Sequence, residues 1–298
     1  MLNRPVIWLF MVGIFFVGMT SCTNNPKTNS ASRSEKPSVQ PVEPALVPLK
    51  ILNWNVLYGF NHGNAIDAGA KWIDAQSPDV VALQELNGNT SASLKGLASR
   101  WKHEHSAILK EKGFPVGLTS SRPIEVIERR VKGFHHGFLH CKTHDIHFFV
   151  VHFWPNKDHE AASIVEKIKP LLAEGQRVIV LGDFNTHSRK DEVFLRTKEK
   201  VTPLFEVVEL FESIGLVDLV HKHDPDAKYS CPSPITIPKW SADLEEVDSK
   251  RQRIDFVFGD SAISQHSTSG KIALTEELEQ ISDHYPVLVE FQLPVGRE

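Results

Sequence analysis

Short apolar runs and longer amphipathic stretches alternate along most of the chain. Runs of about four to eight apolar residues bounded by turn residues predict strands, whereas apolar residues that recur every three or four positions predict helices. This pattern predicts strands at 47–56, 80–84, 105–109, 116–120, 124–131, 137–142, 146–153, 177–182, 253–258 and 286–293. It predicts helices at 65–75, 91–101, 158–174 and 204–214.

The order of these elements bears on the fold class. Several expected strands between residues 105 and 153 follow one another without a helix, while the others alternate with helices. A purely parallel sheet needs a long crossover after each strand, so this order excludes it. This order of elements instead predicts an α/β fold in which two mixed β-sheets pack face to face with helices outside. Because no repeat and no break rich in Gly or Ser interrupts the pattern, we expect one domain at 47–298.

The amino terminus has a different pattern. Residues 6–19 form an apolar run of 14 residues after Arg4, which is too short for a comfortable membrane span but typical of a signal-peptide core. Met19-Thr20-Ser21-Cys22 follows and resembles a bacterial lipoprotein processing site, in which the Cys receives lipid. We therefore expect a lipoprotein signal peptide at 1–22 and an exported protein anchored to the bacterial cell envelope through Cys22. An ordinary secretory signal and an uncleaved anchor are the alternatives.

Residues 23–46 separate this segment from the body. They contain four Pro, four Ser and three Asn and no aromatic residue. Such a stretch cannot bury enough apolar area to offset its chain entropy, so we expect a disordered linker. Export would place Cys141 and Cys231 in an oxidising compartment, where they either pair or stay as two buried thiols.

Composition and charge narrow the function. The 298 residues are 41% apolar and include 17 Phe and 6 Trp, which supports a sizeable core. Residues 47–298 carry 29 Lys and Arg against 35 Asp and Glu. This acidic balance argues against binding nucleic acid through a broad basic face, because neutralising phosphates needs clustered cations. It leaves phosphate chemistry open, since carboxylates can hold a metal ion that bridges to phosphate.

Polar residues follow or begin several of the expected strands. One such residue is ordinary turn chemistry, since Asp and Asn favour turns, but six endings of this kind predict a ligand site. They are Asn53-Trp54-Asn55, Gln84-Glu85, His152, Gly182-Asp183-Phe184-Asn185, Asp255 and Ser282-Asp283-His284.

The order and context of these residues resemble the endonuclease/exonuclease/phosphatase superfamily, which has the deoxyribonuclease I-like fold. The stretch at 114–124, which ends in Ser-Arg-Pro-Ile, also looks like a strand–turn–strand segment of that family. The match covers about residues 49–293. The resemblance implies a four-layer α/β sandwich and divalent-metal-dependent hydrolysis of phosphate esters.

The resemblance also implies a metal site and a base. A phosphate ester repels an anionic nucleophile, and a hard cation that polarises the phosphoryl oxygens offsets this repulsion. The cation would be Mg²⁺ (or Mn²⁺), with Glu85 as its main ligand and Asn55 or Asp283 supporting it directly or through water. Asp183 would orient and deprotonate the attacking water.

The remaining residues would contact the phosphate. Asn185 would donate hydrogen bonds to it, and His284 would bind the phosphoryl group, held as an imidazolium by Asp255 or Asp283. His152 would be the general acid or a second phosphate contact. Family members that cleave abasic sites tend to carry Tyr where His152 stands, so repair of abasic DNA is not expected.

We therefore expect a phosphodiesterase or endonuclease that acts on a phosphate ester of nucleic acid or of a lipid head-group, as a monomer tethered to a lipid bilayer. A phosphomonoesterase or a sphingomyelinase-type lipid phosphodiesterase is the alternative activity. A non-catalytic surface binding lipoprotein with the same fold is the alternative of another class. Such a relic should have lost part of the catalytic set, and none of it is missing.

Three segments remain open or weak. Trp154-Pro155-Asn156 either shapes the pocket or is only a loop turn. The stretch 135–152 contains six His, but no Cys-x-x-Cys or His-Glu-x-x-His spacing accompanies them, so a solvated hairpin with its turn at 142–145 is expected. The Pro-rich stretch 221–253 reads as a long loop near Asp255, either a substrate lid or surface elaboration.

Overall fold

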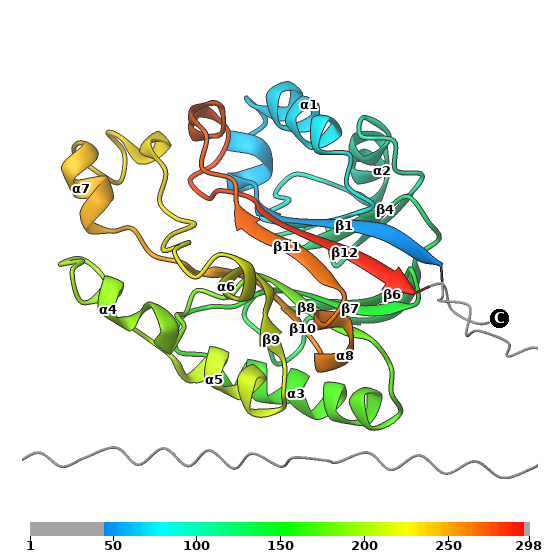
Figure 1. Ribbon diagram of the computed structural model, residues 1–298. Helices are drawn as coiled ribbons and strands as arrows, with labels where there is room; N and C mark the ends of the chain where they lie inside the picture. The colour runs from blue at the N-terminus through cyan, green and yellow to red at the C-terminus, as the bar shows by residue number, and fades with distance from the viewer. Residues whose placement is uncertain (1–44, 295–298) are drawn as a thin grey trace, which may run out of the picture. The chain divides into compact units, whose positions relative to one another are not determined.

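Two six-stranded sheets pack face to face in the computed structural model, which describes residues 45–294 (Figure 1). The first sheet has the order β11 (Ser267–Ile272), β12 (Val287–Pro294), β1 (Leu46–Asn55), β2 (Val80–Gln84), β4 (Gly117–Ser120), β3 (His105–Ile108). The second has the order β5 (Glu125–Arg130), β6 (Phe138–Thr143), β7 (Ile146–His152), β8 (Val178–Asp183), β10 (Asp255–Gly259), β9 (Val217–Asp218). Each sheet has a parallel pair at its centre, β1 with β2 and β7 with β8, flanked by antiparallel strands. The predicted fold class is therefore confirmed.

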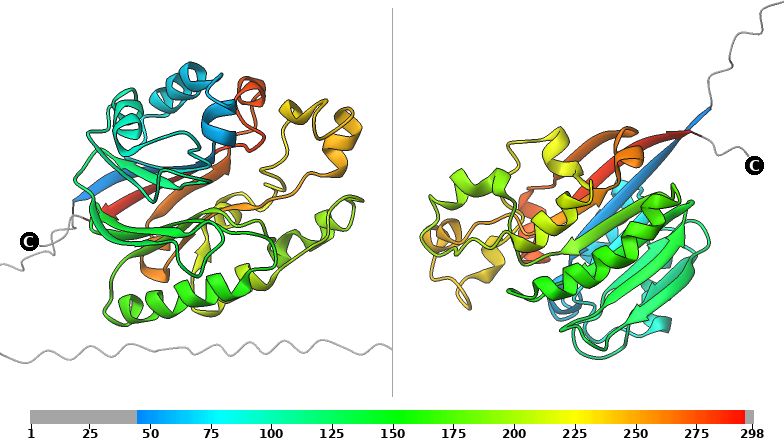
Figure 2. Two further views of the ribbon diagram at one scale, coloured as in Figure 1. Left: turned by 180° about the vertical axis from the view of Figure 1, so that it is seen from behind. Right: turned by 90° about the horizontal axis from the view of Figure 1, so that it is seen from below.

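Helices cover the outer faces of both sheets and complete four layers (Figures 1 and 2). α1 (Ile66–Gln76) and α2 (Ser91–Ser99) lie over the first sheet, and α3 (Asp158–Ala173) and α5 (Glu206–Ser213) lie over the second. Local sequence sets their ends, since α2 begins with a capping box between Thr90 and Ser93. Short helices occupy the connections: α4 (Glu192–Leu195), α6 (Leu219–His223), α7 (Leu244–Ser249), α8 (Ser261–Ser264), η1 (Leu57–Asn61), η2 (Arg189–Asp191), η3 (Pro234–Thr236) and η4 (Glu276–Gln280).

The core has two parts. One fills the space between the sheets and continues to α1 and α2 outside the first sheet, and the other lies between the second sheet and its helices. Successive side chains of a strand point to opposite faces, so Phe148 joins the inter-sheet cluster while Phe149 joins the cluster with α3 and α5. All residues of β2, β7, β8 and β10 are buried. Both faces of these strands are thus committed to apolar packing, which places their chemistry at the strand ends.

The His-rich hairpin turns where expected but is not solvated, so that prediction is wrong. β6 and β7 meet at His144 and Asp145, which both have positive φ. These strands lie inside the second sheet. His140 is buried and stacks on Phe149, with ring centroids 4.0 Å apart, and its Nε2 atom lies 3.0 Å from Nδ1 of His147. Burial lowers the pKa of His140 to about 4, because the charged form loses its hydration.

Two strands and the short helices of the connections escaped prediction, and both strands have weak apolar patterns. β11 reads Ser-Thr-Ser-Gly-Lys-Ile and forms an edge of the first sheet, and β9 has only two residues. An edge strand with one solvated face needs few apolar residues, so its sequence resembles a loop.

The segment 221–253 ends in a buried ion network. Arg253 is fully buried and lies 2.6 Å from a carboxylate oxygen of Asp191 and 2.7 Å from one of Asp218. Removing one partner of such a network typically costs about 3–5 kcal/mol, because the other charges stay buried. The network ties the loops after β8 and β9 to the start of β10.

Cys141 and Cys231 are both free and buried, so of the two alternatives the structure has two thiols. Among residues 45–294, no helix is long and apolar enough to cross a membrane. The predicted signal peptide with Cys22, and the predicted linker up to residue 44, lie outside the described residues.

Candidate active site

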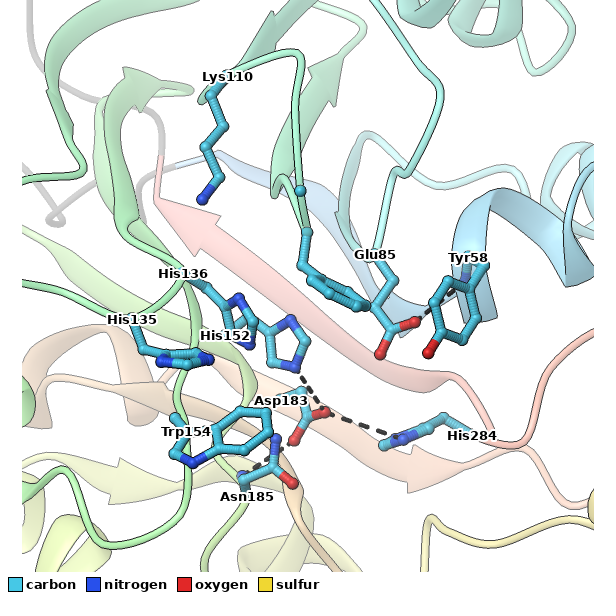
Figure 3. A pocket seen from close by; sticks show the side chains of 12 residues that line it. Tyr58, Glu85, Lys110, His135, His136, His152, Trp154, Asp183, Asn185 and His284 are labelled. Carbon is cyan, nitrogen blue, oxygen red and sulfur yellow. Dashed lines mark hydrogen bonds and ion pairs between the residues drawn. The ribbon is translucent and has the colours of Figure 1, made fainter. Parts of the chain in front are cut away.

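A cavity of about 540 Å³ opens at one end of the sandwich (Figure 3). β1, β2, β7 and β8 end there, and their antiparallel neighbours β10 and β12 begin there, which explains why six separate polar endings meet. Its lining comprises Tyr58, Glu85, Lys110, Gly113, Phe114, His135, His136, His152, Trp154, Asp183, Asn185 and His284.

Strand register places three of the predicted residues side by side. His152 of β7 is paired with Asp183 of β8, and Asp183 is paired with Asp255 of β10. Residues paired across neighbouring strands point to the same face of a sheet, so the three side chains form a row. All three are buried.

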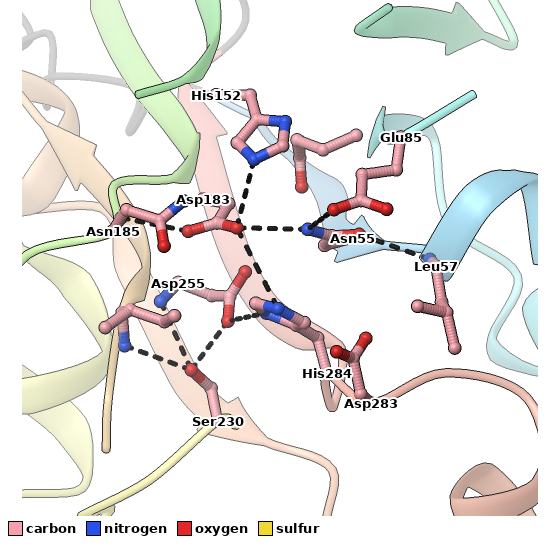
Figure 4. Close-up of polar contacts among 12 residues, drawn as sticks. Asn55, Leu57, Glu85, His152, Asp183, Asn185, Ser230, Asp255, Asp283 and His284 are labelled. Carbon is pink, nitrogen blue, oxygen red and sulfur yellow. Dashed lines mark hydrogen bonds and ion pairs between the residues drawn. The ribbon is translucent and has the colours of Figure 1, made fainter. Parts of the chain in front are cut away.

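Asn55 connects this row to the other sheet (Figure 4). Its Nδ2 donates to Asp183 Oδ2 at 3.0 Å and to Glu85 Oε1 at 3.3 Å, and its Oδ1 accepts from the Leu57 N–H at 3.2 Å. This orientation directs the amide nitrogen toward both carboxylates and engages the oxygen elsewhere. It fits the supporting role predicted for Asn55 better than direct ligation of a metal.

Glu85 reaches the cavity from an uncommon backbone conformation. Its φ is +57°, in the left-handed region that non-glycine residues rarely adopt. Glu85 Oε2 accepts from the Tyr58 N–H at 3.0 Å, which fixes the carboxylate at the cavity wall. Asn185 has a φ of +47°, so strained backbone occurs at a second predicted residue.

The acids fit a hard divalent cation. Burial raises the pKa of Glu85, and the negative charge of Asp283 raises it further. Glu85 lines the cavity, whereas Asp283 lies behind it and lines a neighbouring pocket. Two carboxylates that repel each other are stabilised by a cation that shares them, and Mg²⁺ prefers such oxygen ligands. Glu85 and Asp283 are thus the residues that would hold it. Among the described residues, the groups Cys231–Asp283–His284 and Asp183–Asp255–His284 also bring potential ligand atoms close together.

Asp183 lies at the centre of the polar contacts. Its Oδ1 accepts from the Asn185 N–H at 2.9 Å, while His152 Nε2 and His284 Nε2 lie 3.4 Å and 3.9 Å from its Oδ2. Burial raises the pKa of Asp183 to about 7, although His284 opposes the shift. The carboxylate therefore has a pKa in the range of a general base.

Asp255, and not Asp283, holds His284. Asp255 Oδ2 lies 2.8 Å from His284 Nδ1 and accepts from the Ser230 hydroxyl at 2.6 Å. Burial disfavours the charged imidazole, but attraction from Asp255 and its acidic neighbours outweighs this and raises the pKa of His284 well above its usual value. With Nδ1 engaged, the Nε2 atom faces Asp183 and the cavity (Figures 3 and 4).

His152 differs from His284 in charge. Burial lowers the pKa of His152 well below its usual value, and the neighbouring His136 and His284 add to the effect. His152 stacks on His136 with ring centroids 4.4 Å apart. A neutral ring with Nε2 near Asp183 fits a hydrogen bond to phosphate better than the role of a charged proton donor.

Sequence reasoning missed several contributors. Ser230, in the loop 221–253, donates a hydrogen bond to Asp255. In the sequence, only its place in a loop expected near Asp255 could have pointed to this role. Tyr58, Lys110 and His136 also line the cavity, and each lies within two residues of an expected strand, a position that could have pointed to them. Of the two alternatives for Trp154-Pro155-Asn156, the structure places Trp154 in the cavity lining. The lining contains no described residue of 221–253, which argues against a lid, but Ser230 of this segment supports the site from behind.

Comparisons with known proteins agree with this geometry. The sequence model of the Endonuclease/Exonuclease/phosphatase family matches residues 52–284. No curated protein matches the sequence. A 3′ phosphatase from Neisseria bound to a product DNA hairpin has a TM-score of 0.64 and 19% identity, covering 82% of this chain and 99% of that one.

Two further solved structures are similar in fold. A 3′–5′ exonuclease from Neisseria meningitidis has a TM-score of 0.61 and 20% identity, with 82% of this chain and 100% of that one covered. An AP endonuclease from Archaeoglobus fulgidus has a TM-score of 0.60 and 18% identity, with 82% of this chain and 99% of that one covered.

Gly182 is the residue whose substitution tests how the site is positioned. Its φ is +151°, and a Cβ there would lie 1.9 Å from the Val151 carbonyl oxygen of the neighbouring strand. We expect Gly182→Ala to lower the free energy of unfolding by at least about 2 kcal/mol in urea denaturation, because the strands must separate beside Asp183. Gly96→Ala is the control, since a Cβ at position 96 meets nothing within 4 Å. This substitution should stabilise α2 by up to about 1 kcal/mol, because Ala favours a helix over Gly. A Gly182→Ala protein as stable as the wild type would contradict the close approach of β7 and β8.

Proposed function

The chain belongs to the endonuclease/exonuclease/phosphatase family, and we propose that within it this protein is a divalent-metal-dependent phosphodiesterase of the endonuclease type. The family and the structural neighbours support a phosphoesterase. One observation carries the finer proposal: carboxylates of both sheets converge with His284 on a single cavity.

The completeness of this set favours an enzyme over a binding protein. Glu85, Asp183, Asn185 and His284 line the same cavity, and Asp283 lies close enough to Glu85 to raise its pKa. Burying carboxylates is costly, and a protein without catalysis gains nothing from keeping them together. A non-catalytic surface lipoprotein is therefore the weaker alternative.

Glu85 and Asp283 would hold the cation, and Asn55 would keep Glu85 in place. The bound cation would polarise a phosphoryl oxygen and make the phosphorus a better electrophile. Asp183 would accept a proton from the attacking water. Its Oδ1 is held by the Asn185 N–H, and its Oδ2 lies toward His152 and His284 at the cavity.

Three side chains would bind the phosphate. Asn185 Nδ2 donates one hydrogen to the Phe153 carbonyl at 3.0 Å, which leaves its second N–H for a phosphoryl oxygen. His284 would donate from Nε2, because Asp255 engages its Nδ1. A neutral His152 would donate from Nε2. Such fixed donors stabilise the charge that grows in the transition state.

We further propose that residues 1–22 are a lipoprotein signal peptide, that Cys22 carries the lipid, and that 23–46 form a tether. The protein would then act outside the cytoplasm at the cell envelope. The support is the apolar run at 6–19 followed by Met19-Thr20-Ser21-Cys22.

Metal dependence is the first test of this function. We expect EDTA to abolish hydrolysis of bis-p-nitrophenyl phosphate and Mg²⁺ or Mn²⁺ to restore it. Glu85→Gln should raise the Mg²⁺ concentration for half-maximal activity by at least about tenfold, because it removes a charged ligand. Glu166→Gln, an exposed position on α3, is the matched control and should leave this concentration unchanged. Full activity after thorough chelation would rule out the metal site.

Asp183→Asn tests the base. It keeps the shape of the side chain and one oxygen for the Asn185 N–H, but it removes the basicity and the second oxygen that accepts from Asn55. The kcat should therefore fall by at least about 10³-fold with circular dichroism unchanged. The substrate is the best of a panel of DNA, RNA, sphingomyelin, inositol phosphates and bis-p-nitrophenyl phosphate, which also separates a nuclease from a lipid phosphodiesterase. Asp226→Asn on the surface is the control. A folded Asp183→Asn protein that keeps more than about a tenth of wild-type kcat would show that Asp183 is not the base.

Cys22→Ser tests the anchor. We expect this substitution to release the full-length protein from the membrane fraction of a bacterial host with its specific activity unchanged, because the lipid and the folded domain are separated by the tether. Fractionation and labelling with a radioactive fatty acid provide the measurement. A Cys22→Ser protein that stays in the membrane would identify residues 6–19 as an uncleaved anchor, and a soluble wild type would indicate ordinary secretion.

A further inference from the structure

One side of the cavity is lined by flat rings that the proposed chemistry does not use. Phe114, His135, His136 and Trp154, here called the aromatic wall, come from three different loops or strand ends (Figure 3). His135 lies over Trp154 with ring centroids 4.3 Å apart, and His136 lies 5.1 Å from Phe114 and 5.8 Å from Trp154. Distant segments have thus been brought together to form one surface.

The aromatic wall is continuous with the catalytic residues. His136 stacks on His152 at 4.4 Å, and His152 Nε2 lies 3.4 Å from Asp183. The wall therefore begins one side chain away from the predicted base. A group bound on it would lie next to the phosphate under attack.

The outer part of the wall is open to a ligand. Trp154 is 47% exposed although its indole is large and apolar, and His135 is also exposed. Packing a flat ring against Trp154 would remove this apolar surface from water, which is favourable. His136, which lies next to Trp154, is buried, so the inner part of the wall is held in place by packing.

The charge of the cavity restricts what the wall can bind. Burial lowers the pKa of His136 to about 4, so this ring is neutral at physiological pH. Lys110 is the one lysine or arginine in the lining within residues 45–294. A polyanion such as an inositol polyphosphate would need more cations. Aromatic rings attract the quaternary ammonium of a choline head-group, but Lys110, whose charge reaches His136, places a like charge beside this wall.

We propose that the aromatic wall binds an unpaired nucleobase next to the scissile phosphate, and that the preferred substrate is single-stranded nucleic acid. This inference rests on the proposed phosphodiesterase function. A base within a duplex is already stacked and paired, whereas an unpaired base can stack on an exposed aromatic side chain. Lys110 would contact a neighbouring phosphate of the same strand.

The test compares two short oligomers with the same number of phosphates, one of thymidine and one of abasic tetrahydrofuran units. Fluorescence anisotropy measures their binding to the full chain carrying Asp183→Asn, with Mg²⁺ present, so that cleavage does not interfere. We expect the thymidine oligomer to bind at least about fivefold more tightly, as base stacking on an aromatic side chain predicts.

Variants of two partly exposed tryptophans provide the comparison. In the same background, Trp154→Ala should abolish the preference for the thymidine oligomer, and Trp154→Phe should keep most of it. Trp240→Ala is the matched control, because Trp240 is 40% exposed but does not line this cavity, and it should keep the full preference. Equal binding of the two oligomers, or a preference that survives Trp154→Ala, would overturn the inference.

Three further results separate the alternatives. Displacement of the oligomer by phosphocholine but not by thymidine monophosphate would overturn the inference in favour of a lipid head-group. If the wild-type protein hydrolyses nucleic acid but cleaves thymidine and abasic oligomers equally well, the inference is overturned and the proposed function stands. A Trp154-dependent preference in a protein that hydrolyses no nucleic acid would support the wall and contradict the proposed function.

Discussion

The side-chain amide of Asn55 links the two sheets at the point where the catalytic residues meet. Asn55 Nδ2 donates to Glu85 beside it in the first sheet and to Asp183 at the end of β8 in the second. Two carboxylates this close, one buried and one half-buried, are unfavourable without shared donors or a cation. The shared amide therefore fixes the distance between a metal ligand and a general base. His152 contacts this base, and Asp255 holds His284 beside it.

The local backbone is adapted to this convergence. Glu85 and Asn185 adopt left-handed conformations at the ends of strands whose interiors are apolar and buried. Such conformations cost free energy and persist where surrounding structure determines them, as at many functional sites. Core packing between and outside the sheets holds the strands, which leaves their ends free to direct polar side chains into one cavity.

The sequence predicted the parts of the molecule that have a strong periodic signal. Buried strands such as β2 and β8 were identified because both of their faces are apolar, and Asp183 was singled out because it follows such a run. β11 was missed because an edge strand needs few apolar residues. His140 was expected in water because spacing alone does not reveal that β6 and β7 lie inside the sheet. Ser230 and Lys110 reach the site through loop conformations, which no short-range pattern specifies.

We expect the junction of the two sheets to bind a cation and a phosphate together. This can be measured by anomalous diffraction from crystals grown with Mn²⁺ and inorganic phosphate. Mn²⁺ should lie about 2.1 Å from a Glu85 carboxylate oxygen, with Asp283 close by, and a phosphate oxygen should lie within about 3 Å of His284 Nε2. Mn²⁺ bound away from Glu85, or phosphate bound outside the cavity that Asp183 and His284 line, would contradict this expectation.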